Sequence, residues 1–210
     1  LGIQTDEELS LASMGIYVFN REVLLQLLNN TLTDFGKHII PGAIESHKVY
    51  SHVFQGYWED IGTIRAFFEA NIELTAVLPR FNFFDMSAPV FTRPRFLPAC
   101  KINGANIEQS LITEGCILNS ALIRNSLVGL RSIVAEGAHL YRTVLMGADY
   151  YESAVSIAQN EAEGRPRIGI GRSTRIENAI IDKNARIGDY CVITPAGKPA
   201  DMDHPLYYIR

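Results

Sequence analysis

The sequence predicts two structural classes in one chain, an α/β segment followed by an all-β domain that coils as a parallel β-helix. In residues 1–78, short β-rich runs alternate with segments of helical periodicity, which is typical of α/β domains. From Ile102 onward, branched aliphatic residues recur every five or six positions with small residues between them. That period is typical of hexapeptide-like β-helix repeats.

The composition limits the kinds of partner and compartment. The 210 residues are 47% hydrophobic and carry a net charge of −4, so we expect one or two globular domains and neither a nucleic-acid nor a membrane partner. No apolar run approaches the roughly 20 residues of a membrane span. The three cysteines are widely spaced and form no CxxC pair, so free thiols in a reducing compartment are expected.

The first part of the α/β segment has signals for one strand and two helices. Residues 13–19 have the composition of a buried strand. Asn20 is a candidate N-cap for a helix over residues 21–30, and Asp34 for a short helical turn. Pro41 is expected to break that turn.

The second part of this segment supplies more α/β elements but no closed core. Residues 47–62 predict two strands joined by a turn, and Thr63 begins a helix over residues 63–77. So few strands suggest the last part of a doubly wound domain. The chain starts at Leu1 without Met and stops abruptly at Arg210, and both ends look cut from a longer chain.

A linker is predicted between the two structural classes. Residues 79–98 hold four prolines and five phenylalanines with little periodicity, and proline interrupts helices and ladders. We therefore expect an extended linker over residues 79–98, whose aromatic rings pack on neighbouring domains, and a β-helix over residues 99–210.

The β-helix prediction depends on a set of apolar positions that we expect to face the core. A β-sandwich with strict alternation is the alternative, but a two-residue period fits these positions poorly. Residues 146–165 interrupt the repeat and predict a loop with a short helix ending at Gly164. The expected core positions are Ile102, Ile107, Ile112, Ile117, Leu122, Val128, Ile133, Leu145, Ile170, Ile176, Ile181, Ile187 and Val192.

The strongest candidate for chemistry is the run Gly56-Tyr57-Trp58-Glu59-Asp60-Ile61-Gly62-Thr63. It places two acids at the end of an expected strand and just before an expected helix, where open α/β sheets bind ligands. A carboxylate there can hold Mg²⁺ together with phosphate oxygens. The alternative is a solvated helix N-terminus, where the helix dipole favours acids.

Seven motifs, in this order along the chain, resemble the sugar-nucleotide pyrophosphorylases, and in particular the ADP-glucose pyrophosphorylase family. They are ASMGIYVF (12–19), DFGKHIIP (34–41), GYWEDIGTI (56–64), FTRPRFLP (91–98), MGADYYES (146–153), IGIG (168–171) and IIDKNARIGD (180–189). The resemblance implies the C-terminal remnant of a Rossmann-like nucleotidyltransferase domain, followed by a left-handed parallel β-helix. It also implies the transfer of AMP from ATP to glucose 1-phosphate, with Mg²⁺ as cofactor.

The resemblance assigns five residues to the active site. Asp60 matches a Mg²⁺-binding aspartate of the family, and Ser13 a residue that hydrogen-bonds the glucosyl group. Asp34, Phe35 and Trp58 match positions around the glucose 1-phosphate pocket. From the residues alone, alternatives remain open: a small strand residue for Ser13, a helix cap for Asp34, and core aromatics for Phe35 and Trp58.

A second site for an anionic allosteric effector is also implied. Arg93 and Arg95 match linker positions that contact the effector, and Asp182 and Lys183 match a β-helix segment at the same cleft. Arginine forks and lysine charges suit phosphate oxygens, although such an Arg-Pro-Arg run can equally be a solvated linker pair. The resemblance further implies a tetramer, in the cytoplasm or, in a plant, in the plastid.

The family's Gly-rich phosphate loop, first metal aspartate and sugar-phosphate lysine have no match in this sequence. Residues 1–210 alone are therefore expected to be inactive. Pyrophosphate release from ATP and glucose 1-phosphate above a blank would contradict this expectation.

Two other function classes are compatible with a β-helix. A hexapeptide acyltransferase would need a general-base histidine, and His139 is the only histidine within the repeats. A surface or corner position is the plainer interpretation of His139. A non-catalytic, pyrophosphorylase-like regulatory subunit would not need Ser13, Trp58 and Asp60.

Overall fold

The computed structural model describes residues 12–210, so the first eleven residues of the predicted 1–78 segment lie outside the described part. The chain divides into two compact units, Leu1–Gly56 and Tyr57–Arg210, and each is described by itself. Among the described residues, no helix combines the length and the apolar character needed to cross a bilayer.

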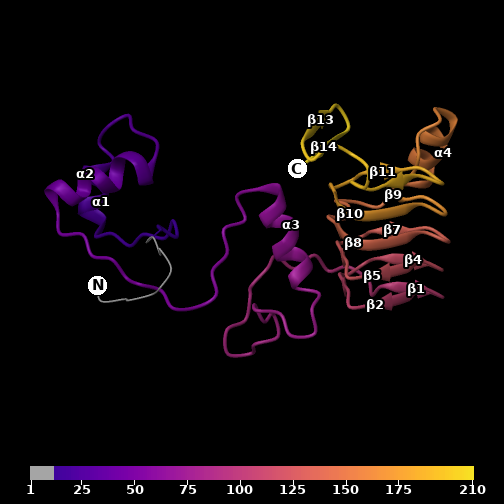
Figure 1. Cartoon of the computed structure of the whole chain (residues 1–210), viewed down its shortest axis with the longest axis horizontal. Coiled ribbons are helices and arrows are strands. Elements are labelled where there is room, and N and C mark those ends of the chain that lie inside the picture. The colour runs from indigo at the N-terminus through magenta and orange to yellow at the C-terminus, as the bar shows by residue number, and fades with distance from the viewer. Residues whose placement is uncertain (1–11) are drawn as a thin grey trace. The chain divides into compact units, whose positions relative to one another are not determined.

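Residues 12–56 contain three helical elements, of which Figure 1 labels α1 and α2. They are α1 (Arg21–Leu27), a π-helical turn η1 (Phe35–Ile39) and α2 (Ile40–Ser46). Asp34 caps η1 as predicted, because its side chain accepts a hydrogen bond from the backbone N–H of Lys37. Asn20 precedes α1, but its side chain makes no capping hydrogen bond.

Two expectations for this region are wrong. Pro41 does not break the helical turn; it lies in the first turn of α2, where a missing N–H leaves no helical hydrogen bond unmade. Residues 13–19 and 47–62 form no strand, and Val18 is 97% exposed. A strand needs a neighbouring strand with which its backbone groups can pair, and residues 12–56 contain no strand at all.

In the second unit, helix α3 (Ile64–Glu73) precedes the β-domain. Thr63 caps it as predicted, accepting a hydrogen bond from the N–H of Ala66 at 3.1 Å. The helix ends four residues before the expected Val77. Residues 79–98 contain turns and bends without helix or strand.

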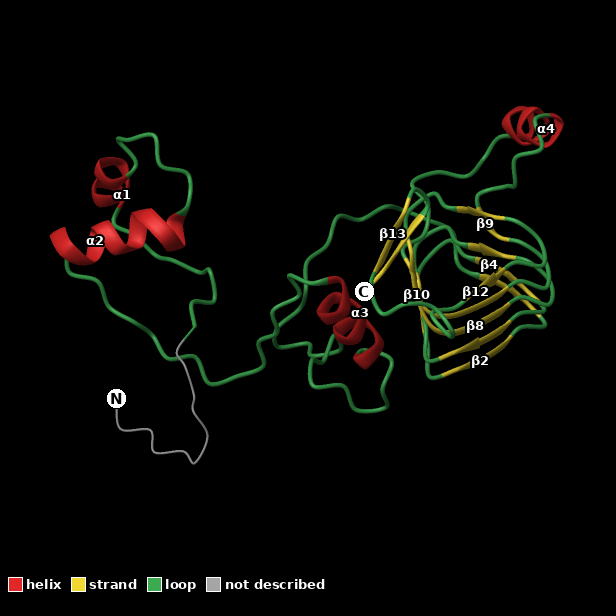
Figure 2. Cartoon of the chain, turned by 45° about the horizontal axis from the view of Figure 1, so that its top comes forward, coloured by secondary structure: helices red, strands yellow, loops and turns green. Residues whose placement is uncertain are grey.

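The rest of the second unit is a parallel β-helix with three faces, whose coils stack like the layers of a prism (Figure 2). The first face consists of β1 (Lys101–Asn103), β4 (Ile117–Asn119), β7 (Ile133–Val134), β9 (Gly169–Ile170) and β11 (Arg186–Ile187). The second face consists of β2 (Asn106–Glu108), β5 (Leu122–Arg124), β8 (His139–Leu145), β10 (Arg175–Ile181) and β12 (Val192–Ile193).

The third face begins with β3 (Leu111–Ile112) and β6 (Leu127–Val128). It continues in the C-terminal parts of β8 and β10, because these long strands turn the corner between two faces. An antiparallel hairpin of β13 (Met202–His204) and β14 (Tyr207–Ile209) ends the chain.

Each coil takes 16 or 17 residues, with one exception. Ile102 lies beside Leu118, 16 residues later, whereas Val134 lies beside Ile170, 36 residues later. The additional residues form the loop and α4 (Ala154–Ala162), which confirms the predicted interruption. Ser153 caps α4, and Gly164 follows it with a φ of +70°.

The core confirms the period but corrects the register. Leu118, Ile123 and Val134 are fully buried, and the expected anchors Ile117, Leu122 and Ile133 each lie one residue too early and are only partly buried. The aliphatic core residue that follows Ile112 is Leu118 and not Ile117, because the corner between them takes one residue more than a five-residue step allows. Val192, also expected inside, is 69% exposed. The core residues are Cys116, Leu118, Ala121, Ile123, Val128, Val134, Ala138, Leu140, Leu145, Ile170, Ile176 and Ile181.

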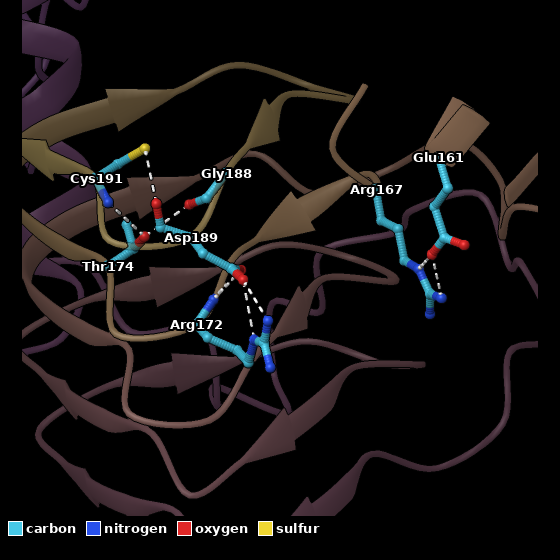
Figure 3. A network of polar contacts seen from close by, with 7 residues as sticks. All are labelled: Glu161, Arg167, Arg172, Thr174, Gly188, Asp189 and Cys191. Carbon is cyan, nitrogen blue, oxygen red and sulfur yellow. Dashed lines mark hydrogen bonds and ion pairs between the residues drawn. The ribbon is translucent and has the colours of Figure 1, made fainter. Parts of the chain in front are cut away.

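Polar side chains join successive coils near the end of the stack (Figure 3). The buried hydroxyl of Thr174 donates to the carbonyl of Gly188 at 2.8 Å and accepts the N–H of Cys191 at 3.1 Å. Arg172 donates to Asp189 through its backbone N–H and its guanidinium. These hydrogen bonds and the ion pair connect one coil to the next through polar groups alone.

All three cysteines are free, as the sequence predicts. Cys116 is fully buried in the β-helix core, and burial raises the pKa of its thiol to about 11. A thiol with so high a pKa holds its proton and is a poor nucleophile.

Candidate functional site

Three of the candidate residues meet in the first unit. The hydroxyls of Ser13 and Tyr17 are 2.9 Å apart, and the ring of Tyr17 stacks on Phe35 with 6.0 Å between centroids. Phe19 lies edge-on to the ring of Phe35, with 6.1 Å between the centroids. Tyr17 thus connects Ser13 to the Asp34-Phe35 pair.

Tyr17 and Phe19 were not predicted as site residues from the sequence. The spacing of Tyr17 and Phe19 was a usable signal for these two rings, because residues two apart in extended chain face the same side. The backbone bends at Gly15, whose φ is +72°, and the hydroxyls of Ser13 and Tyr17 meet across this bend.

Asp34 is positioned by its role as a cap. The backbone N–H of Lys37 donates to Oδ1 of Asp34 at 2.8 Å. This hydrogen bond holds the pKa of Asp34 below its ordinary value, so the group is ionised near neutral pH. The capping alternative is therefore correct, and a contact with substrate stays a prediction.

The remaining candidates lie in the second unit, in an irregular and exposed segment before α3. Trp58 is 43% exposed and does not pack in a core. Oδ1 of Asp60 accepts a hydrogen bond from the N–H of Gly62 at 2.8 Å. Thr63, the N-cap of α3, follows this turn directly. The turn therefore holds Asp60 close to the start of α3.

One carboxylate is a partial ligand set for Mg²⁺. Among residues 12–210, no group of three or more histidine, cysteine, aspartate or glutamate side chains is arranged to hold a metal ion. Mg²⁺ commonly binds one or two carboxylates and completes its shell with water and phosphate. Asp60 therefore fits as one protein ligand of a phosphate-bound Mg²⁺.

The four predicted effector residues form two separate pairs. Arg93 and Arg95 are exposed in the linker, and Arg95 donates to the carbonyl of Arg93 at 3.0 Å. Lys183 forms an ion pair with Asp149 at 2.9 Å, while the carboxylate of Asp182 accepts the N–H of Lys183. No hydrogen bond or ion pair within the described chain joins the two pairs.

The two motifs most specific to the suggested family contact each other. Asn184 and Lys183 both bind the carboxylate of Asp149 at 2.9 Å, and these contacts hold its pKa below the ordinary value. Glu152, whose side chain is 6% exposed, pairs with Arg186 at 2.6 Å. These motifs therefore connect the α4 insertion to the next coil, a role that was not predicted from the sequence.

The buried Glu152 carboxylate predicts a pH-dependent contribution to stability. Burial raises its pKa, but hydrogen bonds from the N–H of Ile168 and from Arg186 outweigh burial, and the net pKa lies below the ordinary 4.5. A depressed folded-state pKa means that the stabilisation is present above pH 4.5 and is lost as the pH falls through the folded-state pKa.

Glu152→Gln is accordingly expected to lower the free energy of unfolding by about 2 kcal/mol at pH 7. The difference from the parent should shrink below pH 4.5. Urea unfolding at several pH values measures this. Glu161→Gln, which removes an exposed pair with Arg167, serves as control, and a difference for Glu152→Gln that is constant with pH would contradict the assignment.

Comparisons with known proteins agree with this architecture. Residues 95–210 match the family model of the GLGC left-handed parallel β-helix domain, and residues 5–77 match the nucleotidyl transferase family model. The chain is 44% identical over 205 residues to the maize (Zea mays) glucose-1-phosphate adenylyltransferase large subunit 1, chloroplastic/amyloplastic.

That match covers 95% of this chain and 40% of the maize protein, so the chain spans about two fifths of its relative's length. The β-helix model alone covers more than half of the chain. The β-helix is therefore left-handed, and the chain belongs to the GLGC family of ADP-glucose pyrophosphorylases, with nucleotidyl transferase sequence ahead of its β-helix.

Proposed function

We propose that this chain is part of an enzyme that transfers AMP from ATP to glucose 1-phosphate, giving ADP-glucose and pyrophosphate. The observation that carries the proposal is the 44% identity to a glucose-1-phosphate adenylyltransferase large subunit over 95% of the chain. Neither an acyltransferase based on His139 nor a regulatory subunit is favoured by that match.

The proposed roles follow from the chemistry of each side chain. The hydroxyl of Ser13, which is shared with Tyr17, is suited to hydrogen-bond the glucosyl hydroxyls. The exposed faces of Phe35 and Trp58 are suited to pack against the sugar. Asp34 fixes Phe35 at the start of η1. This reaction depends mainly on positioning and on electrostatic stabilisation of phosphate charge.

Asp60 is proposed to hold Mg²⁺. The ion, when bound, supplies positive charge at the α-phosphate and at the leaving pyrophosphate. The turn between Asp60 and Gly62 leaves Oδ1 occupied by a backbone N–H. We assign the ligand role to the carboxylate as a whole, anchored by this turn.

Regulation and assembly are proposed on the same basis. Arg93, Arg95, Asp182 and Lys183 would form the site for an anionic effector, which must compete with Asp149 for Lys183. A tetramer, and a location in the plastid or the cytoplasm, are further parts of the proposal. The maize relative is described as chloroplastic/amyloplastic.

Asp60→Asn tests the proposal. In the intact protein, the Mg²⁺ concentration for half-maximal pyrophosphate release is expected to rise by at least about 10–100-fold, the loss typical when only an outer-shell partner of a metal ligand is changed. Asp85→Asn is the matched control, because Asp85 also accepts the N–H two residues later, from Ser87 at 2.8 Å. A protein with no adenylyl transfer, or equal effects of both variants, would refute the proposed role.

A further inference from the structure

Arg80, an arginine of the linker, contacts the exposed Trp58–Asp60 segment and its surroundings. The contacts of Arg80 with Tyr57, Glu59 and Glu73 are called the brace below. Arg80 donates from Nε to Glu73 at 2.5 Å and makes a second hydrogen bond to the same carboxylate. It also pairs with Glu59 at 3.4 Å. Its guanidinium lies over the ring of Tyr57, 5.2 Å from the centroid. Arg80 therefore contacts Tyr57 and Glu59, the two residues that flank Trp58.

The far end of this brace is the last residue of α3. Glu73 ends the helix, and its carboxylate also accepts the backbone N–H of Arg80 at 3.2 Å. The Arg80 side chain thus connects the residues before α3 to the residue that ends it. Residues 57–60 are all exposed and form no strand. Besides Arg80, the ring of Phe81 lies 6.0 Å from that of Tyr57, and Gly62 donates to Asp60. Of these contacts, only those of Arg80 reach the end of α3.

Helix α3 is itself fixed to the β-helix. Arg142, at a corner within β8, donates to both carboxylate oxygens of Glu69, at 3.2 and 3.0 Å. Its guanidinium lies 5.6 Å from the ring centroid of Phe68, and its Nε donates to Asn178 of the next coil at 3.0 Å. Arg142 has a left-handed φ of +45°, a costly conformation that persists where its surroundings determine it.

We propose that Arg80 is a positioning residue for the Trp58–Asp60 segment, which it holds against the helix that the β-helix fixes. The inference rests on the proposed function, because it concerns the segment assigned to glucose 1-phosphate and Mg²⁺. Exposed ion pairs contribute little to global stability, and the Arg80 side chain is 61% exposed. The brace should therefore act on the geometry of the segment and not on overall folding.

Trp58 is the only tryptophan in the chain, so its fluorescence reports on this segment alone. In Arg80→Gln, acrylamide quenching should rise toward that of a fully exposed tryptophan, about twofold from the present 43% exposure. Arg80→Lys keeps the charge but loses the two-pronged contact, so it should lie between parent and Arg80→Gln. Glu73→Gln removes the same contact from the other side and should resemble Arg80→Gln.

Arg167→Gln is the matched control. Arg167 binds Glu161 through Nε and Nη2, and its side chain is 62% exposed, nearly the same as that of Arg80. Its quenching should equal that of the parent, and all variants should share the parent's urea midpoint. Unchanged quenching in both Arg80→Gln and Glu73→Gln, or an equal change in Arg167→Gln, would overturn the brace.

Kinetics of the intact protein test the functional consequence. The KM for glucose 1-phosphate should rise about tenfold in Arg80→Gln, with a smaller change in Arg80→Lys, because a loosened segment must be ordered on binding. If quenching rises but KM does not, the brace exists and its positioning role is refuted. If the parent transfers no AMP, the proposed function fails, while the quenching series still decides whether the brace exists.

Discussion

Ile123→Ala is expected to lower the free energy of unfolding by about 2–5 kcal/mol, the range for removing a buried aliphatic side chain in a packed core. The side chain of Ile123 is fully buried. It is aligned with Ile107 on one side and Leu140 on the other. A cavity at this position therefore affects three coils at once.

Leu122→Ala is the matched control, because Leu122 lies next in sequence and is only partly buried on the outer side of the same strand. Its cost should stay below about 1 kcal/mol, as for most surface substitutions. Urea unfolding followed by circular dichroism measures both variants. If Leu122→Ala were the more destabilising, the register of this face would be the one expected from the sequence and not the one described.

Gly147→Ala is expected to have an effect of similar size through the backbone. Gly147 has a φ of +89°, and a Cβ placed there would lie 2.3 Å from the carbonyl oxygen of Leu130. Left-handed strain and overpacking together predict a cost of about 2–5 kcal/mol. Since the obstacle is backbone of a neighbouring coil, the coils themselves must separate to relieve the clash.

Gly164→Ala separates the two causes. Gly164 has a similar φ of +70° but open space where a Cβ would lie, so only the strain of roughly 1–2 kcal/mol applies. Thermal unfolding of the two variants gives the comparison. Equal losses would mean that strain alone acts at Gly147 and that the coils can shift at no cost.

The sequence was sufficient for the period of the repeat and for the caps at Asp34 and Thr63, though not for a cap at Asn20. The five-to-six-residue step predicted the β-helix, and Gly164 was predicted as the end of the helix inserted where the repeat stops. The register was wrong at Ile117, Leu122 and Ile133, and right again at Val128, because a corner can take one residue more or less. A residue count does not show this, since only the pairing of Ile102 with Leu118 across coils reveals it.

The candidate site was predictable mainly through the resemblance. Ser13 and Trp58 are ordinary residues by composition, and the strands expected around them do not form. The contacts that organise their surroundings are long-range. Arg142 and Glu69 are 73 residues apart, so their pairing depends on the tertiary structure and leaves no periodic signal.

The 36-residue coil has a consequence for how this protein can vary in length. The pairing of Val134 with Ile170 continues the stack although α4 intervenes, so the cross-section of the prism does not depend on what is inserted at this corner. Doubling the length of a flexible loop adds only about 0.6 kcal/mol of closure entropy. That is less than one buried methylene contributes. As long as the ion pair between Glu152 and Arg186 connects the insertion to the next coil, this corner can gain or lose residues while the coils on either side stay aligned.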